Sequence, residues 1–147
     1  MKKKIALAAD HAGFNLKEKI KKYLVESGYE VKDFGCHSTD SVDYPDYVHP
    51  AAGSVESGLF DMGFAVCGSG NGMSMTANKY PGIRCALCWN QEISSLARAH
   101  NNANMCSLPG RFMSDAEAIL IVKTFLDTDF DGGRHQRRIE KISLKRI

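Results

Sequence analysis

The sequence predicts an α/β protein in which helices cover a five-stranded parallel sheet. Short apolar runs alternate five times with longer amphipathic stretches along the 147 residues, as in chains whose parallel strands are joined by helices. The chain is 44% hydrophobic and 24% charged, which is the balance of a globular protein with a buried core. No linker, repeat or low-complexity segment divides it, so we expect residues 1–147 to form a single domain.

The strands are predicted from their apolar runs. The third run, MGFAVC at residues 62–67, is almost wholly apolar, as a central strand of a parallel sheet should be. The expected strands are Lys4–Ala9, Glu30–Phe34, Met62–Cys67, Arg84–Trp89 and Asn104–Leu108.

A helical pattern follows each strand. In the first, Leu16, Ile20 and Leu24 recur at helical spacing, and Gly28 then ends the helix. Ser114 and Glu117 form a capping box that begins the last helix of the alternation. The expected helices are Phe14–Ser27, Tyr47–Glu56, Asn71–Asn78, Gln91–His100 and a helix from the Ser114 cap to about Leu126.

The tail from Asp131 to Ile147 departs from this alternation. After a double glycine comes the basic segment RHQRR at residues 134–138, with isoleucines interspersed up to Ile147. Arg134 and Arg138 share one helical face if the helix already includes Arg134, and two guanidinium groups on one face suit a phosphate. A helix here has no strand to return to, so we expect it to extend to a partner subunit. A solvated amphipathic helix is the alternative.

Composition and charge exclude several classes of function. The basic tail lacks interleaved aromatic residues and the chain lacks a high pI, so no nucleic-acid partner is expected. No window reaches the roughly 18 apolar residues of a membrane span, so no membrane partner is expected either. The run Ile5–Ala9 is shorter than the roughly 7–15 residues of a signal-peptide core, which indicates a cytoplasmic protein. Five cysteines are an odd number and, in the cytoplasm, are expected to be free thiols.

A cysteine followed by a glycine-rich turn forms the motif with the clearest chemistry. Cys67 ends the buried third strand, and a helix is expected to begin within the turn that follows it, Gly68-Ser69-Gly70-Asn71-Gly72. The amides of such a turn bind a phosphate or a developing oxyanion. The same setting favours the thiolate form of a cysteine. Cys67 is therefore a candidate base or nucleophile, and a cysteine that only packs beside a tight turn is the alternative.

Three chemistries use such a motif, and the sequence excludes two of them. A cysteine-dependent phosphatase needs an arginine six residues after the cysteine, where this chain has Met73. A dinucleotide site needs G-x-G-x-x-G after the first strand, where this chain has DHAG at residues 10–13. The third chemistry, proton abstraction next to a carbonyl, needs a base, an oxyanion hole, an acid and an anchor for a charged substrate. The candidates for these four parts are Cys67, the Gly68–Gly72 amides, His100, and Arg134 with Arg138.

The polar segments after three of the strands should form one site. Ligands of parallel sheets bind beyond the carboxyl ends of the strands. Asp10-His11 follows the first strand, Cys67–Gly72 the third, and Leu108–Arg111 the fifth. We therefore expect these three clusters to lie together.

The remaining histidines and cysteines have ordinary structural interpretations. His100 either caps the end of its helix or acts as an acid. Cys85 and Cys88 form a C-x-x-C, but an offset of three places them on opposite faces of a strand, so no joint redox or metal role is expected. No cluster of histidine, cysteine and acidic residues has the spacing of metal ligands, so we expect neither a metal nor a cofactor.

Together these motifs resemble the type B ribose-5-phosphate isomerases, whose wider family includes the galactose-6-phosphate isomerase subunits of the lactose pathway. The match runs in order along nearly the whole chain. The matching segments are DHAG at 10–13, DYP at 43–45, CGSGNG at 67–72, ANK at 77–79, GIR at 82–84, AHN at 99–101 and GGRH at 132–135.

The resemblance implies a flavodoxin-like three-layer α/β/α sandwich. It also implies a homodimer, or a dimer of dimers, with active sites at the subunit interface. The implied reaction is the interconversion of ribose 5-phosphate and ribulose 5-phosphate through a cis-enediolate, a step of the pentose phosphate pathway that uses no metal.

The resemblance further implies a role for each matching residue. Cys67 corresponds to the base that moves a proton between C1 and C2, and His100 to the acid that opens the furanose ring with help from Asp10. The amides of Gly68 to Gly72 correspond to the enediolate hole, which Ser69 supports. The other implied substrate contacts are the phosphate clamp of Arg134 and Arg138 with His11 beside it, together with Tyr44, Asn101 and Arg111.

Two departures bear on the substrate. Residues 68–79 contain no acid, which excludes the branch of the family in which a downstream glutamate replaces the cysteine as base. Ser69-Gly70-Asn71 stands where relatives often have threonine or isoleucine, so a hexose 6-phosphate such as allose or galactose 6-phosphate stays open. A non-catalytic sugar-phosphate sensor is the third alternative, and the joint presence of Cys67, His100 and Asp10 argues against it.

Overall fold

The computed structural model describes residues 2–144, and Ile147 of the predicted tail lies outside them. Five parallel strands form one sheet in the order β2-β1-β3-β5-β4. The strands are β1 (Lys4–Ala9), β2 (Glu30–Asp33), β3 (Met62–Cys67), β4 (Cys85–Leu87) and β5 (Met105–Pro109).

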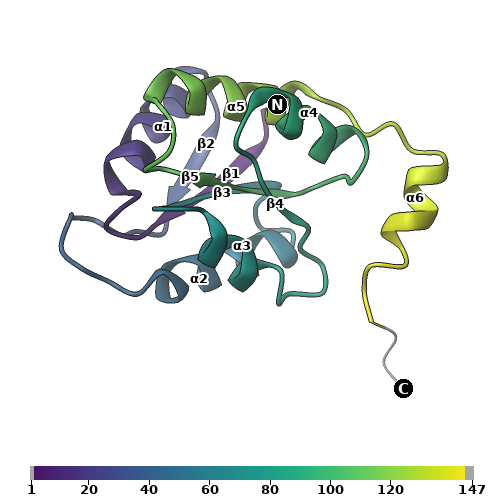
Figure 1. The fold of residues 1–147 in the computed structure, drawn as a ribbon, viewed down its shortest axis with the longest axis horizontal. Coiled ribbons are helices and arrows are strands. Elements are labelled where there is room, and N and C mark those ends of the chain that lie inside the picture. The colour runs from purple at the N-terminus through teal and green to yellow at the C-terminus, as the bar shows by residue number, and fades with distance from the viewer. Residues whose placement is uncertain (1, 145–147) are drawn as a thin grey trace.

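Helices cover both faces of this sheet, which confirms the predicted three-layer sandwich. Figure 1 shows α1, α4 and α5 on one face and α2 and α3 on the other. The helices are α1 (Phe14–Glu26), α2 (Tyr44–Glu56), α3 (Asn71–Ala77), α4 (Gln91–Ala99), α5 (Asp115–Asp127) and α6 (Arg134–Ile139). Within residues 2–144, no helix combines the length and the apolar character that a bilayer span requires.

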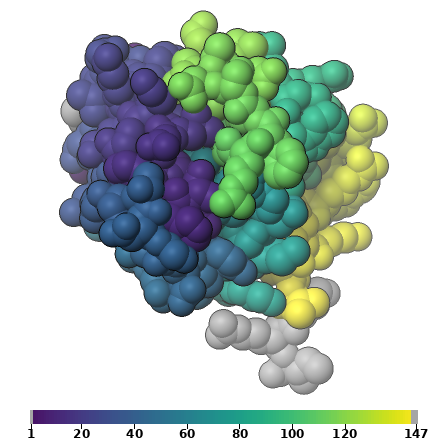
Figure 2. Space-filling model, turned by 60° about the vertical axis from the view of Figure 1, so that its left-hand side comes forward, coloured from purple at the N-terminus to yellow at the C-terminus, as the bar shows by residue number. Residues whose placement is uncertain are grey.

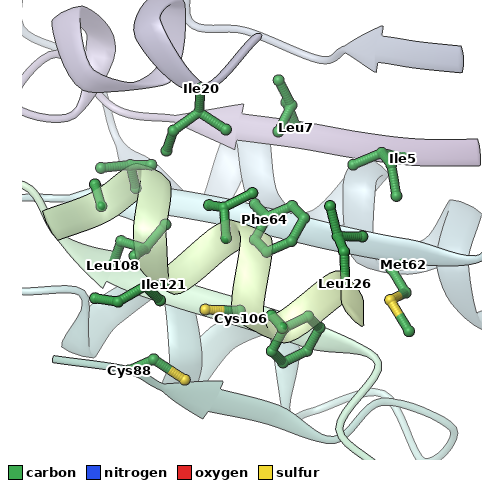
Figure 3. Packing of buried hydrophobic residues seen from close by; sticks show 14 of the residues in the cluster. Ile5, Leu7, Ile20, Met62, Phe64, Cys88, Cys106, Leu108, Ile121 and Leu126 are labelled. Carbon is green, nitrogen blue, oxygen red and sulfur yellow. The ribbon is translucent and has the colours of Figure 1, made fainter. Parts of the chain in front are cut away.

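Each face of the sheet has its own hydrophobic core. On the α1/α5 face the rings of Phe64, labelled in Figure 3, and Phe125 meet edge to face at 5.4 Å. On the other face the sheet presents small residues such as Ala8 and Ala65, so α2 and α3 pack close to it. Cys67 belongs to this second face, because successive side chains of β3 alternate between the two.

Two predicted boundaries are wrong by more than one residue, and both have local causes. Helix α2 begins at Tyr44 and not at Tyr47, because Asp43 is extended and Pro45 lies in the first turn, where its fixed φ suits a helix. Strand β4 is confined to Cys85–Leu87, at the edge of the sheet. The backbone pairing ends at the amide of Cys88, which donates to the carbonyl of Ser107 at 3.0 Å, and the chain then leaves the sheet because Asn90 is the N-cap of α4.

The strand order places two loops where a ligand can bind. Compared with the simple doubly wound order 2-1-3-4-5, the last two strands are exchanged, which leaves β4 at the edge. The order reverses between the neighbours β1 and β3, and such a reversal opens a crevice at the carboxyl ends of the strands. Asp10 follows β1 and Cys67 ends β3, so both predicted residues lie at this crevice.

Helix α6 stands apart from the sandwich. Arg134 is its first residue, so Arg134 and Arg138 share a helical face as expected. No residue of α6 is buried within the chain. The C-terminal segment projects from the side of the molecule in Figure 1, and in Figure 2 it lies across from the N-terminal segment.

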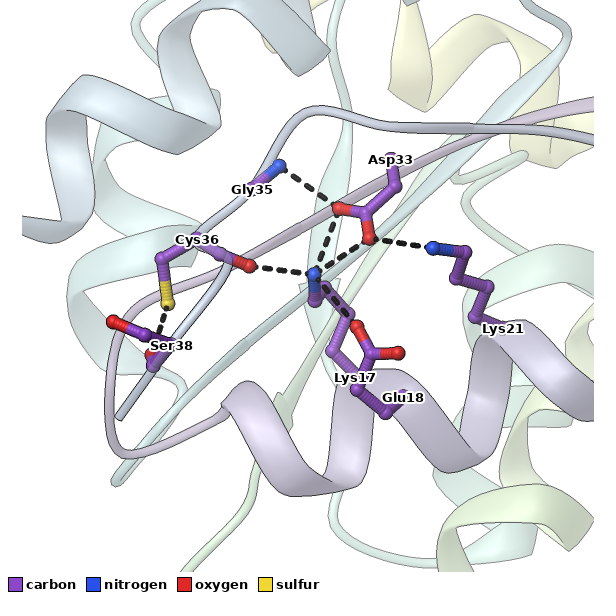
Figure 4. A network of polar contacts seen from close by, with 7 residues as sticks. All are labelled: Lys17, Glu18, Lys21, Asp33, Gly35, Cys36 and Ser38. Carbon is purple, nitrogen blue, oxygen red and sulfur yellow. Dashed lines mark hydrogen bonds and ion pairs between the residues drawn. The ribbon is translucent and has the colours of Figure 1, made fainter. Parts of the chain in front are cut away.

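A fully buried lysine fixes the loop that follows β2. Lys17 of α1 has no exposed side-chain surface and donates to both carboxylate oxygens of Asp33, at 2.7 and 2.8 Å, and to the carbonyl of Cys36 (Figure 4). Burial alone would raise the pKa of Asp33, but the hydrogen bonds from Lys17, Gly35 and Lys21 outweigh it and lower that pKa. The ion pair therefore ties α1 to the loop that leads towards Tyr44.

We expect Lys17→Met to lower the free energy of unfolding by about 3 kcal/mol, because it leaves the carboxylate of Asp33 largely buried with only Lys21 opposite. Urea denaturation measures this. Lys21→Met is the matched control, since Lys21 bonds the same carboxylate but is 40% exposed, and it should cost less than about 1 kcal/mol. Because the pKa of Asp33 is lowered in the folded protein, its ionised carboxylate stabilises the fold at pH values above the ordinary pKa of 3.8, and this stabilisation is lost as the pH falls below that value. The free energies of unfolding of the wild type and of Lys17→Met should therefore converge in acid. Equal losses for the two lysine variants would contradict this account.

Candidate active site

A pocket of about 480 Å³ lies at the carboxyl ends of β1, β3 and β5. It contains residues from all three polar clusters that the sequence placed at this edge, which confirms that those clusters meet. The lining residues are Asp10, Tyr44, Cys67, Gly68, Ser69, Asn71, Gly72, Met75, Arg111 and Phe112.

A second hollow, of about 660 Å³, lies between the edge strand β4 and the tail. It is larger, but the one thiol that lines it, Cys85, is not suited to acid–base chemistry. Burial raises the pKa of Cys85 to about 12, so it stays protonated near neutral pH. We therefore place the chemistry in the smaller pocket, where Cys67 lies.

The turn after β3 brings a backbone amide to the thiol. The amide of Gly70 donates to Cys67 Sγ at 3.2 Å, which orients the sulfur. Gly70 has a φ of +78°, and a Cβ there would lie 2.4 Å from a methyl group of Leu87 and 3.1 Å from the backbone of Leu108. Only glycine fits this conformation and this space, so the glycine is required to build the site.

Other amides of the turn are open to a ligand. Within residues 2–144, the amides of Gly68, Ser69 and Gly72 donate to no protein acceptor, and all three residues line the pocket. The amide of Asn71 donates to Ser69 Oγ at 3.3 Å, which holds the Ser69 side chain over the turn. Such a group of free amides binds a phosphate or an oxyanion.

Asp10 and His11 are both held by backbone amides. One carboxylate oxygen of Asp10 accepts from Ala12 and Gly13 at 3.0 and 3.1 Å, so the carboxylate is fixed at the pocket wall. The Nδ1 atom of His11 accepts from the amide of Val42 at 3.2 Å. A neutral His11 ring therefore carries its proton on Nε2, from which it can donate to a ligand oxygen. His11 lies beside the pocket but is not among its lining residues.

Arg111 and Tyr44 form two walls around the glycine turn. A Cβ on Gly68 would lie 3.2 Å from Nη1 of Arg111, and a Cβ on Gly72 would lie 2.5 Å from the Tyr44 ring. The guanidinium group thus lies directly against the turn and adds positive charge to the amides. The rim is apolar and exposed, with Met75 at 67% and Phe112 at 77% exposure.

Six predicted site residues do not line this pocket. His11 and Gly70 are next to residues that do, whereas the other four come from the end of α4, the loop before β5 and α6: His100, Asn101, Arg134 and Arg138. His100 caps the end of α4, just before β5 begins at Met105. Cys67 pairs with Pro109 at the other end of β5. The strand from Met105 to Pro109 is itself about 13 Å long. Within one chain, the predicted base therefore lies at the carboxyl ends of the strands and the predicted acid at their amino ends.

His100 belongs to a cluster that sequence spacing did not indicate. Its ring stacks on that of His135 at 4.2 Å and 12°, and its Nε2 lies 3.9 Å from a carboxylate oxygen of Asp131. Desolvation and the neighbouring His100 and Arg134 lower the pKa of His135, which favours the neutral form of its ring. The cluster joins α4 to the segment before α6, so no motif in one segment could signal it.

These three residues are also the cluster that comes closest to a set of metal ligands in residues 2–144, with their ligand atoms within 4.8 Å of one another. The prediction that no such cluster exists was incomplete. However, the lone pairs of nearly parallel imidazole rings run side by side and do not converge on one ion. The arrangement suits ring stacking better than metal binding.

The other cysteines have the structural roles expected from the sequence. Cys85 and Cys88 belong to the cores on opposite faces of the sheet, as their spacing predicted. Burial raises the pKa of Cys36 and Cys106 as well as that of Cys85. Cys67 is the thiol that lines the pocket at the carboxyl edge.

Fold and site together define a class of protein: a doubly wound α/β protein that places a thiol beside an anion-binding turn at the switch point of its sheet. Comparison with known proteins identifies the family. The model of the family described as Ribose/Galactose Isomerase matches residues 5–142. The chain belongs to this family.

Individual relatives resemble it over nearly their full length. Ribose-5-phosphate isomerase B of Escherichia coli (strain K12) is 42% identical over 141 residues, which cover 96% of this chain and 95% of the relative. The crystal structure of a ribose 5-phosphate isomerase from Thermotoga maritima is 55% identical with a TM-score of 0.94, covering 96% and 97% of the two chains. Ribose-5-phosphate isomerase B from Mycoplasma genitalium, solved with bound ribulose-5-phosphate, is 42% identical with a TM-score of 0.92, covering 95% and 93%.

Proposed function

We propose that the protein is an aldose–ketose isomerase that interconverts D-ribose 5-phosphate and D-ribulose 5-phosphate. The observation that carries this proposal is the position of Cys67, which lines a pocket together with Gly68, Ser69 and Gly72, whose amides are open. Relatives at 42% and 55% identity bear the name ribose-5-phosphate isomerase, and one structural relative was solved with bound ribulose-5-phosphate.

The proton transfer follows from the arrangement of the turn. The Cys67 thiolate removes the proton from C2 of the open-chain aldose, the electron pair forms the C1–C2 double bond, and negative charge develops on O1. The open amides and the Arg111 guanidinium stabilise the resulting cis-enediolate. The hydroxyl proton of O2 then passes to the neighbouring O1, and the thiol returns the carbon-bound proton to C1 as O2 becomes the carbonyl oxygen, which gives the ketose.

Ring opening and phosphate binding are assigned to the other group of residues. His100 donates a proton to the furanose ring oxygen, and the fixed carboxylate of Asp10 takes the proton of the anomeric hydroxyl. Arg134 and Arg138, on one face of α6, clamp the phosphate, and His11 approaches it from the pocket side. Asn101 and Tyr44 contact the sugar. Each step is assigned to a side chain or an amide, so the proposal includes no metal and no cofactor.

We further propose that a second copy of the chain completes each site. Within one chain, Cys67 lies beside the end of β5, and His100 precedes its start. The exposed apolar rim of Met75 and Phe112 and the unburied α6 both provide surface for a second copy. A homodimer, alone or paired into a tetramer, would then have its sites at the subunit interface.

The compartment is part of the same proposal. All five cysteines are free thiols in the structure, which is typical of a reducing compartment. We therefore assign the isomerase, as one domain spanning residues 1–147, to the cytoplasm.

A substrate panel tests the proposed function. We expect kcat/KM for ribose 5-phosphate to exceed that for allose 6-phosphate and galactose 6-phosphate by about 10-fold or more, since a pocket fitted to five carbons discriminates against a sixth. A preference for a hexose phosphate would assign the protein to the other substrate class of the family. Tight binding of a sugar phosphate without turnover of any would identify a sensor.

A further inference from the structure

We propose that Asp131 and His135 are positioning residues that hold His100, the ring-opening acid, at a fixed place relative to the phosphate clamp on α6. This inference rests on the proposed function, because His100 and the two arginines have their roles only in that reaction. It adds two residues to which neither the sequence motifs nor the pocket gave a role.

The first support is the set of contacts around His100. The ring of His135 covers one face of His100 at 4.2 Å, which restricts rotation of the His100 side chain. The carboxylate of Asp131 lies 3.9 Å from Nε2 and favours an orientation of the ring towards it. The backbone amide of Asp131 also donates to the carbonyl of Ala99 at 2.9 Å, so this segment is fixed to the end of α4.

The second support is how little else holds α6. None of its residues is buried, and none belongs to either hydrophobic core. In residues 2–144, the other hydrogen bonds from the segment after α5 to the rest of the chain lie at its two ends. They join Thr128 to Thr124 at 2.6 Å and to Arg98 at 3.3 Å, and Ser143 to Pro81 at 3.5 Å. Among these contacts with the rest of the chain, those of His100 with Asp131 and His135 are therefore nearest in sequence to Arg134 of the phosphate clamp.

The reaction explains why such a link would be useful. The furanose ring oxygen and the phosphate belong to one small molecule and are separated by a few bonds. The acid on α4 and the arginines on α6 must therefore approach one substrate together. Displacing a catalytic group by about 1 Å can cost about 100-fold in rate. A direct contact between His100 and the first turn of α6 holds both parts in one geometry.

The test compares two reactions that differ in their need for the acid. Isomerisation of ribose 5-phosphate begins with ring opening. Exchange of the C1 hydrogen of ribulose 5-phosphate in D₂O does not, because this ketose has no furanose ring to open. We expect His135→Ala and Asp131→Asn to lower kcat for isomerisation by about 10-fold. Exchange at saturating ribulose 5-phosphate should stay within about 2-fold of wild type, because Cys67 and its turn are untouched.

Three further variants make the comparison specific. His135→Phe keeps a ring to stack on His100 and should restore most of the isomerisation that His135→Ala loses. Gln136→Ala, the exposed neighbour on α6, should behave as wild type. His100→Ala sets the reference, since it should lose isomerisation and keep exchange.

The outcomes separate the two proposals. If His100→Ala shows the selective loss while His135→Ala and Asp131→Asn isomerise normally, the positioning role is wrong and the proposed function stands. Parallel losses of isomerisation and exchange in the Asp131 and His135 variants would show general structural damage and would also overturn the positioning role. If His100→Ala isomerises as wild type does, the assignment of the acid is wrong, and the positioning inference fails with it.

Discussion

Cys67→Ala is expected to lower kcat for ribose 5-phosphate by about 10³-fold, because the variant has no group at this position that can accept the C2 proton. The substitution removes one sulfur atom from a residue that is 5% exposed, so the fold should persist. The open amides and Arg111 also remain, and the variant should bind ribose 5-phosphate with little change in Kd. Stopped assays of ribulose 5-phosphate and calorimetric titration measure the two quantities.

Two further variants distinguish a base from a packing residue. Cys67→Ser keeps the size of the side chain and an acceptor for the Gly70 amide, but a hydroxyl ionises far less readily than a thiol, so it should be nearly as inactive as the alanine variant. Cys88→Ala removes a buried thiol outside the pocket and should retain wild-type kcat. A Cys67→Ser protein with substantial turnover would show that the thiol only packs beside the turn.

Mixing two inactive variants should restore activity. If each site combines Cys67 of one chain with His100 of the other, a dimer of Cys67→Ala with His100→Ala contains one doubly altered site and one intact site. Random exchange of subunits makes about half of the dimers mixed, so activity should rise to about one quarter of wild type. Each variant measured alone provides the baseline.

The restored activity must depend on pairing of chains. It should appear only after the two variants are unfolded and refolded together, or co-expressed, and it should be absent when each is refolded alone before mixing. A mixture that stays at the sum of the two separate activities would show that each site lies within one chain. That result would require α6 and the end of α4 to reach Cys67 within one chain, in an arrangement different from this structure.

Much of the fold could be predicted because the local signals agree with the tertiary structure. The apolar run of residues 62–67 is β3, and the capping box of Ser114 and Glu117 is present at the start of α5. Most boundaries lie within one residue of those predicted. The strand order was not predictable in the same way, because the exchange of β4 and β5 depends on contacts between segments distant in sequence.

The site also has a part that could be predicted from local sequence and a part that could not. Cys67 and its glycine turn are one continuous segment, so their geometry could be read from the motif, and strand topology then brought Asp10 and Arg111 beside them. The stack of His135 on His100 joins residues that are 35 positions apart and lie at different helices, so no local sequence pattern could predict it. Likewise, spacing alone could not show that His100 lies at the amino ends of the strands, away from Cys67. That follows from the direction in which α4 runs back between β4 and β5.

The most direct test of the account is isomerisation of ribose 5-phosphate by the wild-type protein in D₂O, followed by NMR. Proton transfer through Cys67 predicts ribulose 5-phosphate that carries deuterium at C1, and recovered ribose 5-phosphate that gains deuterium at C2. The Cys67→Ala variant should show neither label within the same time. Formation of ribulose 5-phosphate without any solvent deuterium, or labelling by Cys67→Ala at the wild-type rate, would contradict the central claim that Cys67 transfers this proton.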